Sequence, residues 1–454
     1  MNKLFLLLTQ LIGSFLYATN IHAQNIPGEY IEAALSNNLV LKERKVSLQK
    51  SLIALQQARS LFLPTTWFEG QYTLAKGGRT IDIPVGDLMN PVYKTLNQLT
   101  NSNGFTSIGN VSEQLNPNNF YDVRIRTTMP LYNPDLKINR DMQQQQVQLQ
   151  QSEVDIYKRA LVKEVKTAYY NYLLTGKAII IYQNALQVVN QNLRMNESLL
   201  KNGKGLPAYV SRAESEVNVV RSQLQTAVND QQNARAAFNF LLNRPFTDSI
   251  IVMETTLTDS LAMRINSGQD GITGREELNS LSLAKEINAN QLKMNYGFRK
   301  PRLNAFLDLA SQGFDFEVNN KSIYYLGGVQ LQIPIFAGKR NLYKIKQTTL
   351  ETQAIDINTA NTIQQLELSA LVSRNNMITS YNNYHTALKQ EEAARQYFKL
   401  INKGYTEGVN SFIEFLDARN QLTSSNLQAV INQYKVLSAA ADYERQTASY
   451  SFKY

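Results

Sequence analysis

The sequence predicts a mixed, mainly α-helical fold: a duplicated unit of long antiparallel coiled-coil hairpins, with four β-strands of the membrane-crossing type. Three observations predict it. Long segments carry apolar residues at heptad spacing, short segments alternate apolar and polar side chains, and the pattern occurs twice. The chain also has only 21 glycines and 11 prolines among 454 residues, which is few for a compact, loop-rich enzyme.

Residues 1–23 have the pattern of a secretory signal peptide. Lys3 provides the positive charge, an apolar core follows, and Ala23 ends a plausible cleavage site. A membrane anchor is the alternative, but polar residues interrupt a stretch that is short for a span of about 20 residues. We therefore expect an exported chain whose mature form begins near Gln24.

The charge distribution argues against a nucleic-acid partner. The formal net charge is +9, but the cations are scattered along the chain. The one denser run, residues 157–166, contains Glu164 and has the helical spacing of a solvated face. The chain contains no cysteine, so neither a disulfide nor a lipidated cysteine can anchor it.

The chain repeats itself at an interval of about 204 residues. Pro130 and Pro334 follow similar apolar segments, and Gly203 and Gly408 each precede an alanine by ten residues. Each repeat is expected to contain a helix, two strands, a long helix, a turn and a second long helix. The expected segments are a first repeat at 24–243, a linker at 244–275 and a second repeat at 276–454.

The helical hairpins are predicted at 134–243 and 340–450. Apolar positions recur in steps of four and three, as coiled coils require. In the first long helix these positions are Leu161, Val165, Ala168, Tyr172, Thr175, Ile179, Tyr182, Leu186, Val189 and Leu193. A helix over residues 134–203 would extend roughly 105 Å at 1.5 Å per residue, which is too long for a globular core.

Four strands are predicted at 64–75, 120–132, 301–312 and 323–335. Each is about ten residues long and has one apolar and one polar face, as membrane barrel strands do. A soluble β-sandwich is the alternative, which export and the flanking aromatic residues disfavour. Four strands cannot close a barrel, and lipid leaves no partner for an open edge. Several chains must then share one barrel of eight, twelve or sixteen strands.

Residues 76–119 join the first two strands and are rich in Gly, Asn and Ser. The corresponding segment of the second repeat, roughly 313–322, is short. We interpret 76–119 as an insertion at a loop tip, forming an external loop that packs on itself or partly covers the mouth of the barrel.

The sequence has no candidate catalytic group. Of its two histidines, His22 lies in the signal peptide, and His385 lies on a helix without a metal-binding cluster. The segment 337–341, AGKRN, lacks the residues of a phosphate-binding loop. We expect no enzyme activity, no metal and no cofactor.

The motifs MPLYN, IPIFAGKRN and GYTEGVNSFIEFLDA, together with the duplicated hairpins, resemble the TolC-type outer-membrane efflux proteins. The resemblance covers essentially the whole mature chain. It implies a homotrimer with a 12-stranded barrel in the outer membrane of a Gram-negative bacterium and a helical tunnel that extends into the periplasm.

The resemblance also implies a passive exit duct of a tripartite efflux or type I secretion system. The expected partners are a periplasmic adaptor protein and an inner-membrane transporter of the RND, ABC or MFS type. A structural or adhesive envelope protein with the same architecture remains the alternative. A periplasmic adaptor is disfavoured, since adaptors carry a single hairpin and flanking β-domains.

The two glycine turns are the candidate adaptor contacts that the resemblance implies. They would lie at the periplasmic ends of the hairpins. The residues are Gly203, Lys204, Gly205, Gly408 and Val409. The alternative is that the glycines only reverse the chain, because glycine commonly ends helices.

The resemblance places the narrowest point of the pore at Glu414 and Asp417. Their spacing of three puts both carboxylates on one face of a helix, and a threefold ring of them would attract cations and be blocked by them. The alternative is that both acids simply favour the N-terminus of a helix.

Tyr405 matches the gating tyrosine of the family. Two other parts of the family's lock are missing, because Asn410 stands where an arginine is expected and Tyr209 where an aspartate is expected. A charged clasp therefore cannot hold the closed state. We expect packing of Tyr405 against Tyr209 to replace it.

Overall fold

The computed structural model describes residues 28–253 and 271–452. The expected signal peptide and the middle of the expected linker lie outside these residues. Two compact units comprise the chain: a helical unit from Met1–Leu52, Gln145–Glu286 and Glu351–Tyr454, and a sheet unit from Ile53–Gln144 and Ile287–Leu350.

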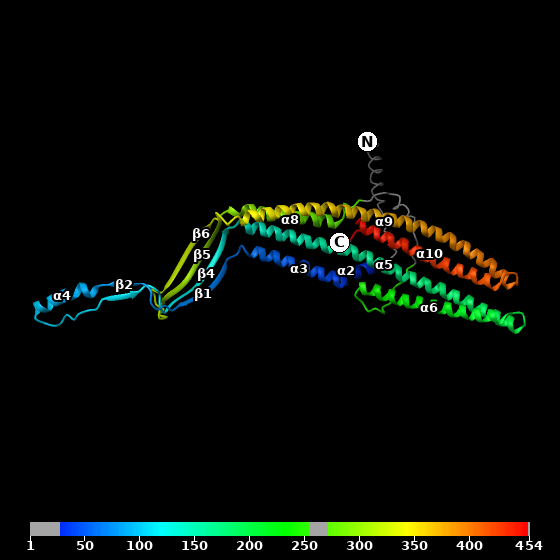
Figure 1. Ribbon diagram of the computed structural model, residues 1–454, viewed down its shortest axis with the longest axis horizontal. Coiled ribbons are helices and arrows are strands. Elements are labelled where there is room, and N and C mark those ends of the chain that lie inside the picture. Colours follow the sequence, from blue (N-terminus) through cyan, green and yellow to red (C-terminus); the bar gives the residue numbers. More distant parts are fainter. Residues whose placement is uncertain (1–27, 254–270, 453–454) are drawn as a thin grey trace, which may run out of the picture. The chain divides into compact units, whose positions relative to one another are not determined.

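The predicted mainly helical fold is confirmed. The helices of both repeats are α2 (Gly28–Asn37), α3 (Leu39–Ser60), α5 (Pro134–Lys201), α6 (Pro207–Leu241), α8 (Glu276–Tyr296), α9 (Arg340–Thr406) and α10 (Phe412–Gln446) (Figure 1). Helix α5 with α6, and α9 with α10, form the two long hairpins, in which α5 has 68 residues and α9 has 67. No helix in the described ranges is both long enough and apolar enough to span a bilayer.

Gly176 lies inside α5 without interrupting it. A Cβ atom at this position would be 3.0 Å from Nε2 of Gln231 in α6. That atom ends a flexible side chain, so the space around position 176 does not require glycine, which has a helix propensity about 1 kcal/mol lower than that of alanine.

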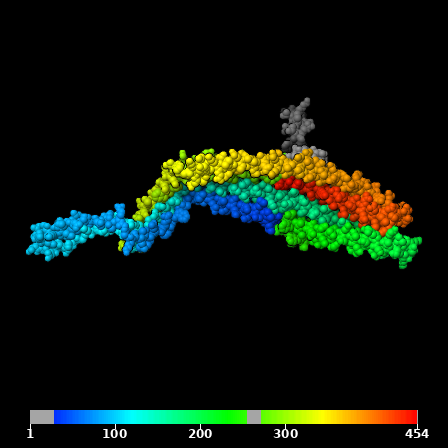
Figure 2. All heavy atoms as spheres, in the orientation of Figure 1, coloured from blue at the N-terminus to red at the C-terminus, as the bar shows by residue number. Residues whose placement is uncertain are grey.

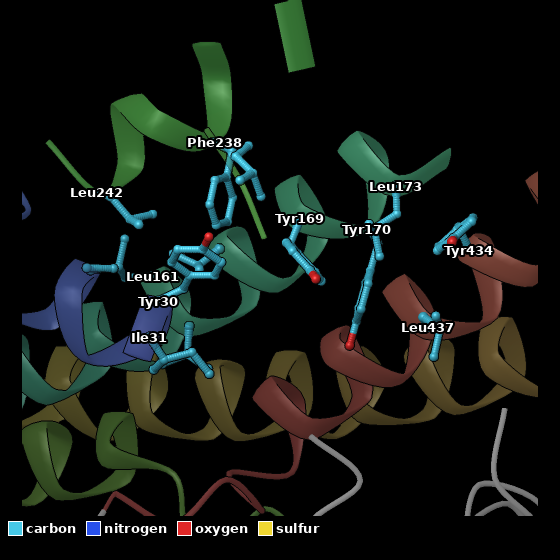
Figure 3. Packing of buried hydrophobic residues seen from close by; sticks show 14 of the residues in the cluster. Tyr30, Ile31, Leu161, Tyr169, Tyr170, Leu173, Phe238, Leu242, Tyr434 and Leu437 are labelled. Carbon is cyan, nitrogen blue, oxygen red and sulfur yellow. The ribbon is translucent and has the colours of Figure 1, made fainter. Parts of the chain in front are cut away.

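The core of the helical unit is an aromatic cluster where α2, α5, α6 and α10 meet (Figure 3). Tyr30 and Phe238 make an edge-to-face contact with ring centroids 5.1 Å apart. The Tyr169 hydroxyl donates to Ile251 O at 3.0 Å and accepts from Met253 N at 3.1 Å. This hydroxyl therefore fixes the chain that follows the first hairpin against α5.

The sheet unit contains a four-stranded antiparallel sheet in the order β1-β4-β5-β6. The strands are β1 (Thr65–Thr73), β4 (Phe120–Tyr132), β5 (Arg302–Phe314) and β6 (Ile323–Gln332) (Figure 1). The last predicted strand ended at residue 335, and β6 ends three residues earlier. Pro334 follows that end and has no N–H to donate to a ladder. Strands β1 and β6 are the two edges.

One face of this sheet is apolar and exposed. Phe68, Ile125, Leu309 and Tyr325 lie side by side across the four strands, with exposed fractions of 75, 46, 55 and 80%. On the other face, Asp308 is 1% exposed and accepts two hydrogen bonds from Arg126, at 2.7 and 2.6 Å. The two faces therefore differ in polarity as the alternating sequence predicts.

The segment 76–119 is not a plain loop. It contains β2 (Thr80–Ile83) paired with β3 (Val111–Gln114), and helix α4 (Val85–Thr100) between them. Helix α4 was not predicted from the sequence. The ladder of β2 and β3 supports the expectation that the insertion packs on itself.

Candidate functional site: the two helical turns

The first turn is a Schellman motif, the reversal that glycine favours at helix C-termini. Lys204 N donates to Leu199 O at 2.9 Å, and Gly203 N donates to Leu200 O at 3.0 Å. Gly203 has a φ angle of 68°, in the left-handed region that costs other residues strain. A Cβ at Gly205 would be 2.7 Å from Leu200 N, so both glycines are required by the backbone.

The second turn has the same hydrogen bonds 205 residues later. Val409 N donates to Gly404 O at 2.7 Å, Gly408 N donates to Tyr405 O at 3.2 Å, and Gly408 has a φ angle of 80°. The glycine pair that reveals the repeat in the sequence therefore marks two equivalent backbone turns.

The two turns differ in how the next helix begins. Ser411 and Glu414 form a capping box at α10: Ser411 Oγ accepts from Glu414 N at 3.2 Å, and Glu414 Oε2 accepts from Ser411 N at 2.6 Å. Helix α6 instead begins after Leu206, without a side-chain cap, and has Pro207 in its first turn. Only the second turn therefore presents a carboxylate held at a helix N-terminus.

Glu414 has a structural role that the resemblance did not imply. The hydrogen bond from the Ser411 backbone, then those from the Ser411 and Asn410 side chains, hold the pKa of Glu414 below its ordinary value of 4.5. Glu414 is therefore ionised at neutral pH. Both Glu414 and Asp417 are exposed, whereas the neighbouring Phe415 and Ala418 are buried. Their charges are accessible to ions.

Tyr405 and Tyr209, which were expected to pack together, share an aromatic neighbour. Each ring contacts Phe412, with centroids 6.2 Å and 5.3 Å apart respectively. Tyr405 also stacks on Phe415 at 4.9 Å, and its hydroxyl accepts from Asn196 Nδ2 at 3.1 Å. Phe412 therefore links the tyrosine of the second hairpin to that of the first.

Asn410 occupies the space that a side chain at position 404 would fill. A Cβ at Gly404 would overlap the Asn410 side-chain oxygen, and Asn410 N donates to Gly404 O at 3.2 Å. Gly404 is thus a further turn residue that the sequence analysis missed. Its signal is the pair of glycines four residues apart in GYTEG.

The two hairpins are also joined near their turns by an apolar cluster. Its buried members are Ala213 from α6 and Phe412, Phe415 and Leu416 from α10. Figure 2 shows the hairpin coloured green against the one coloured orange to red at this end of the helical unit.

A buried ion pair reinforces this contact. Arg419 Nη2 donates to Glu216 Oε2 at 2.8 Å, and these side chains are only 4% and 10% exposed. Glu216 also pairs with Arg212 at 2.9 Å. Burial lowers the pKa of Arg419, whereas Glu216 raises it.

The described residues hold no group of three His, Cys, Asp or Glu side chains arranged to bind a metal. His385 is an exposed residue of α9 whose ring lies edge-on to that of Tyr381, with ring centroids 4.5 Å apart. His22 lies outside the described residues.

Paired long helices whose heptad positions are buried or partly buried, and a sheet with one exposed apolar face and one polar face, are the architecture expected of an outer-membrane channel. Residues 30–244 and 299–445 match the model of the outer membrane efflux protein family. The chain belongs to this family. Its members are channels of the Gram-negative outer membrane that extend into the periplasm, and they are not enzymes.

Solved channel structures share the fold. The Vibrio cholerae outer membrane protein VceC is 15% identical with a TM-score of 0.72, covering 92% of this chain and 95% of that chain. The open state of the Neisseria gonorrhoeae MtrE channel is 15% identical with a TM-score of 0.70, covering 95% and 93%. The Campylobacter jejuni CmeC channel is 12% identical with a TM-score of 0.70, covering 92% and 85%. No curated protein sequence matches the chain.

Proposed function

We propose that three copies of this chain form a passive exit duct of a tripartite efflux or type I secretion system, with a shared 12-stranded barrel. One observation carries the proposal. The four-stranded sheet has an exposed apolar face and two open edges, β1 and β6. In lipid an unpaired edge is costly, so β1 of one copy would pair with β6 of the next.

The adaptor would bind the two glycine turns. Each turn has large apolar side chains exposed to solvent. Leu206, beside the first turn, is 56% exposed, and Val409 and Ile413, at the second, are 79% and 69% exposed. The neighbouring Gly203, Lys204, Gly205 and Gly408 set the backbone that carries them. An adaptor tip that covers both turns would bury these side chains. The energy for export would come from an inner-membrane transporter.

The pore constriction would be a ring of Glu414 and Asp417 from three copies. Six carboxylates around one axis would concentrate cations and be blocked by multivalent ones. Opening would separate the hairpins, which requires breaking the contacts through Phe412 and the pair Glu216–Arg419.

Conductance in planar bilayers tests the duct. The purified protein should form trimers that carry small currents blocked by a trivalent cation such as hexamminecobalt. Glu414→Gln with Asp417→Asn should remove the block but keep the trimer, because glutamine at the third helical position can still complete a capping box.

Gln421→Asn, farther along α10, is the control and should leave the block unchanged. Trimers without any current would favour a structural or adhesive envelope protein. Currents whose block survives the double substitution would remove the ring assignment and leave the duct.

A further inference from the structure

The polar face of helix α4 makes hydrogen bonds to the segment that follows the helix. Asn90 Nδ2 donates to Ile108 O at 2.9 Å, and Asn90 Oδ1 accepts from Ile108 N at 2.8 Å. Asn97 makes the same two bonds with Phe105, at 2.8 Å and 3.0 Å. The two asparagines are seven residues apart and share one helix face. Each side-chain amide bonds to both the N–H and the C=O of one residue, as a neighbouring strand does in an antiparallel sheet.

A close contact confirms which face of α4 is the inner one. A Cβ at Gly86 would be 2.6 Å from Ile108 O, so glycine is required there. Asn110 Oδ1 accepts from Asp87 N at 3.1 Å, and Asn110 Nδ2 donates to Asp87 Oδ2 at 2.9 Å. The returning segment 105–110 is thus fixed against this face (Figure 1).

The nearly opposite face of α4 is apolar and exposed. Its residues follow steps of three and four: Val85, Leu88, Val92, Thr95 and Leu99. Leu88 is 68% exposed, Val92 is 49% and Leu99 is 78%. This is the spacing of a coiled-coil seam. An amphipathic helix usually turns its apolar face toward the rest of its own chain, but α4 turns its polar face that way.

Further copies of this chain fit this stripe better than a charged partner does. The insertion 76–119 has three acidic and three basic residues, so it carries no net charge to attract one. It leaves from the end of β1, the edge strand at which the proposed trimer is joined. That end is opposite to the strand ends that connect to α3 and α5, and it would lie at the outer mouth of the proposed barrel. Threefold symmetry would place three identical stripes around one axis.

We propose that the α4 helices of three copies pack through Val85, Leu88, Val92, Thr95 and Leu99 into a three-helix bundle over the outer mouth of the barrel. The proposal rests on the trimeric duct proposed above. A helix of 16 residues is about 24 Å long, enough for four turns of contact. The bundle would narrow the exit at the cell surface.

Disulfide trapping tests the bundle directly, since the chain has no native cysteine. Leu88→Cys and Val92→Cys should each give a covalent dimer of this chain on mild oxidation of the intact trimer, because seam positions bring Cα atoms within reach of a disulfide, about 4 to 7 Å. Lys94→Cys and Gln98→Cys, also exposed on α4, are matched controls that should stay monomeric on a denaturing gel.

The result separates the two proposals. A trimer by light scattering in which Leu88→Cys and Val92→Cys do not cross-link, or cross-link no more than the controls, would overturn the bundle and leave the duct. The absence of a trimer would overturn the duct itself. A cross-link to another protein in intact cells would also overturn the bundle.

Conductance gives a second readout. Leu88→Lys with Leu99→Lys should drive the helices apart through like charges and raise the current, whereas Lys94→Gln with Gln98→Lys should leave it unchanged. An unaltered current in the first variant, in trimers of normal yield, would contradict a bundle over the outer mouth.

Discussion

Arg419 of α10 donates a hydrogen bond of 2.8 Å to Glu216 of α6, and both side chains are almost fully buried between the two hairpins. Burying two charged side chains costs desolvation free energy, which is repaid only while the charges stay paired. The ion pair therefore ties the contact between hairpins to one specific arrangement. Any movement that separates α6 from α10 must break it or move both residues together.

Glu216→Gln should destabilise the protein more than Arg419→Met. Loss of one partner from a buried pair costs about 3 to 5 kcal/mol when the remaining charge stays buried. Glu216→Gln leaves the guanidinium of Arg419 in that position, whereas Arg419→Met leaves Glu216 paired with Arg212. Thermal unfolding of the detergent-solubilised protein, followed by circular dichroism, measures the difference.

Arg212→Gln is the control for this comparison, because Arg212 is 62% exposed and such pairs contribute about 0 to 1 kcal/mol. The double variant Glu216→Leu with Arg419→Leu should recover stability relative to Glu216→Gln. Equal losses in Glu216→Gln and Arg212→Gln would contradict a buried pair.

Ser411→Ala should fray the start of α10 and cost about 1 kcal/mol, as loss of an N-cap typically does. The matched change in the first hairpin is Leu206→Ala, which removes no side-chain cap. Hydrogen exchange at residues 412–416 should accelerate in Ser411→Ala, and exchange at 207–211 should not change in Leu206→Ala. Equal protection at 412–416 in wild type and Ser411→Ala would exclude a working cap.

The order of the second turn should depend on pH through Glu414. Its pKa is lower in the folded protein than in the unfolded chain, where 4.5 is ordinary. The carboxylate therefore stabilises the turn fully above the ordinary pKa, and this contribution is lost as the pH falls through the lowered folded value. Proteolysis or hydrogen exchange at 408–416 should increase below pH 4.5, and Glu414→Gln should remove most of this dependence.

Gly205→Ala should disrupt the first turn, since the added methyl group would lie 2.7 Å from Leu200 N, a backbone atom that cannot move independently. We expect a loss of about 1 to 3 kcal/mol in local stability. Limited proteolysis should show faster cleavage near residues 200–206. Lys204→Ala, in the same turn, is the control and should be cleaved at the wild-type rate by a protease that does not cut after lysine, such as chymotrypsin.

Tyr169→Phe should destabilise the helical unit. The hydroxyl serves two backbone groups, Ile251 O and Met253 N, and buried polar groups left unpaired cost about 1 to 3 kcal/mol. Tyr343→Phe, at a site 61% exposed, should have little effect on thermal unfolding. Equal midpoints for the two variants would contradict the role of the Tyr169 hydroxyl.

The sequence is informative about elements whose signal is local. Heptad steps from Leu161 to Leu193 predict one face of α5 because helix period and burial are linked at short range. Gly203 and Gly408 predict two equivalent turns because a left-handed backbone favours glycine wherever it occurs. The alternation in β4 and β5 likewise predicts which face carries Ile125 and which carries Arg126.

Pairings over long distances in sequence were not predictable from these signals. Glu216 and Arg419 are 203 residues apart, and periodicity shows which face a residue occupies but not which helix covers it. The expectation that Tyr405 packs against Tyr209 did not include Phe412, which contacts both rings. Helix α4 was missed because Gly86, Pro91 and its asparagines are typical of a loop, although its apolar residues follow helical spacing.

The open edges of β1 and β6 affect the biogenesis of the chain. A newly exported copy carries two rows of unpaired backbone groups, which in isolation invite pairing with any extended segment nearby. The sheet would then fold at the same time as its edges pair with those of other copies. The yield of mature protein would therefore depend on subunit concentration. Cells that express this gene weakly should accumulate degraded chains rather than stable single subunits.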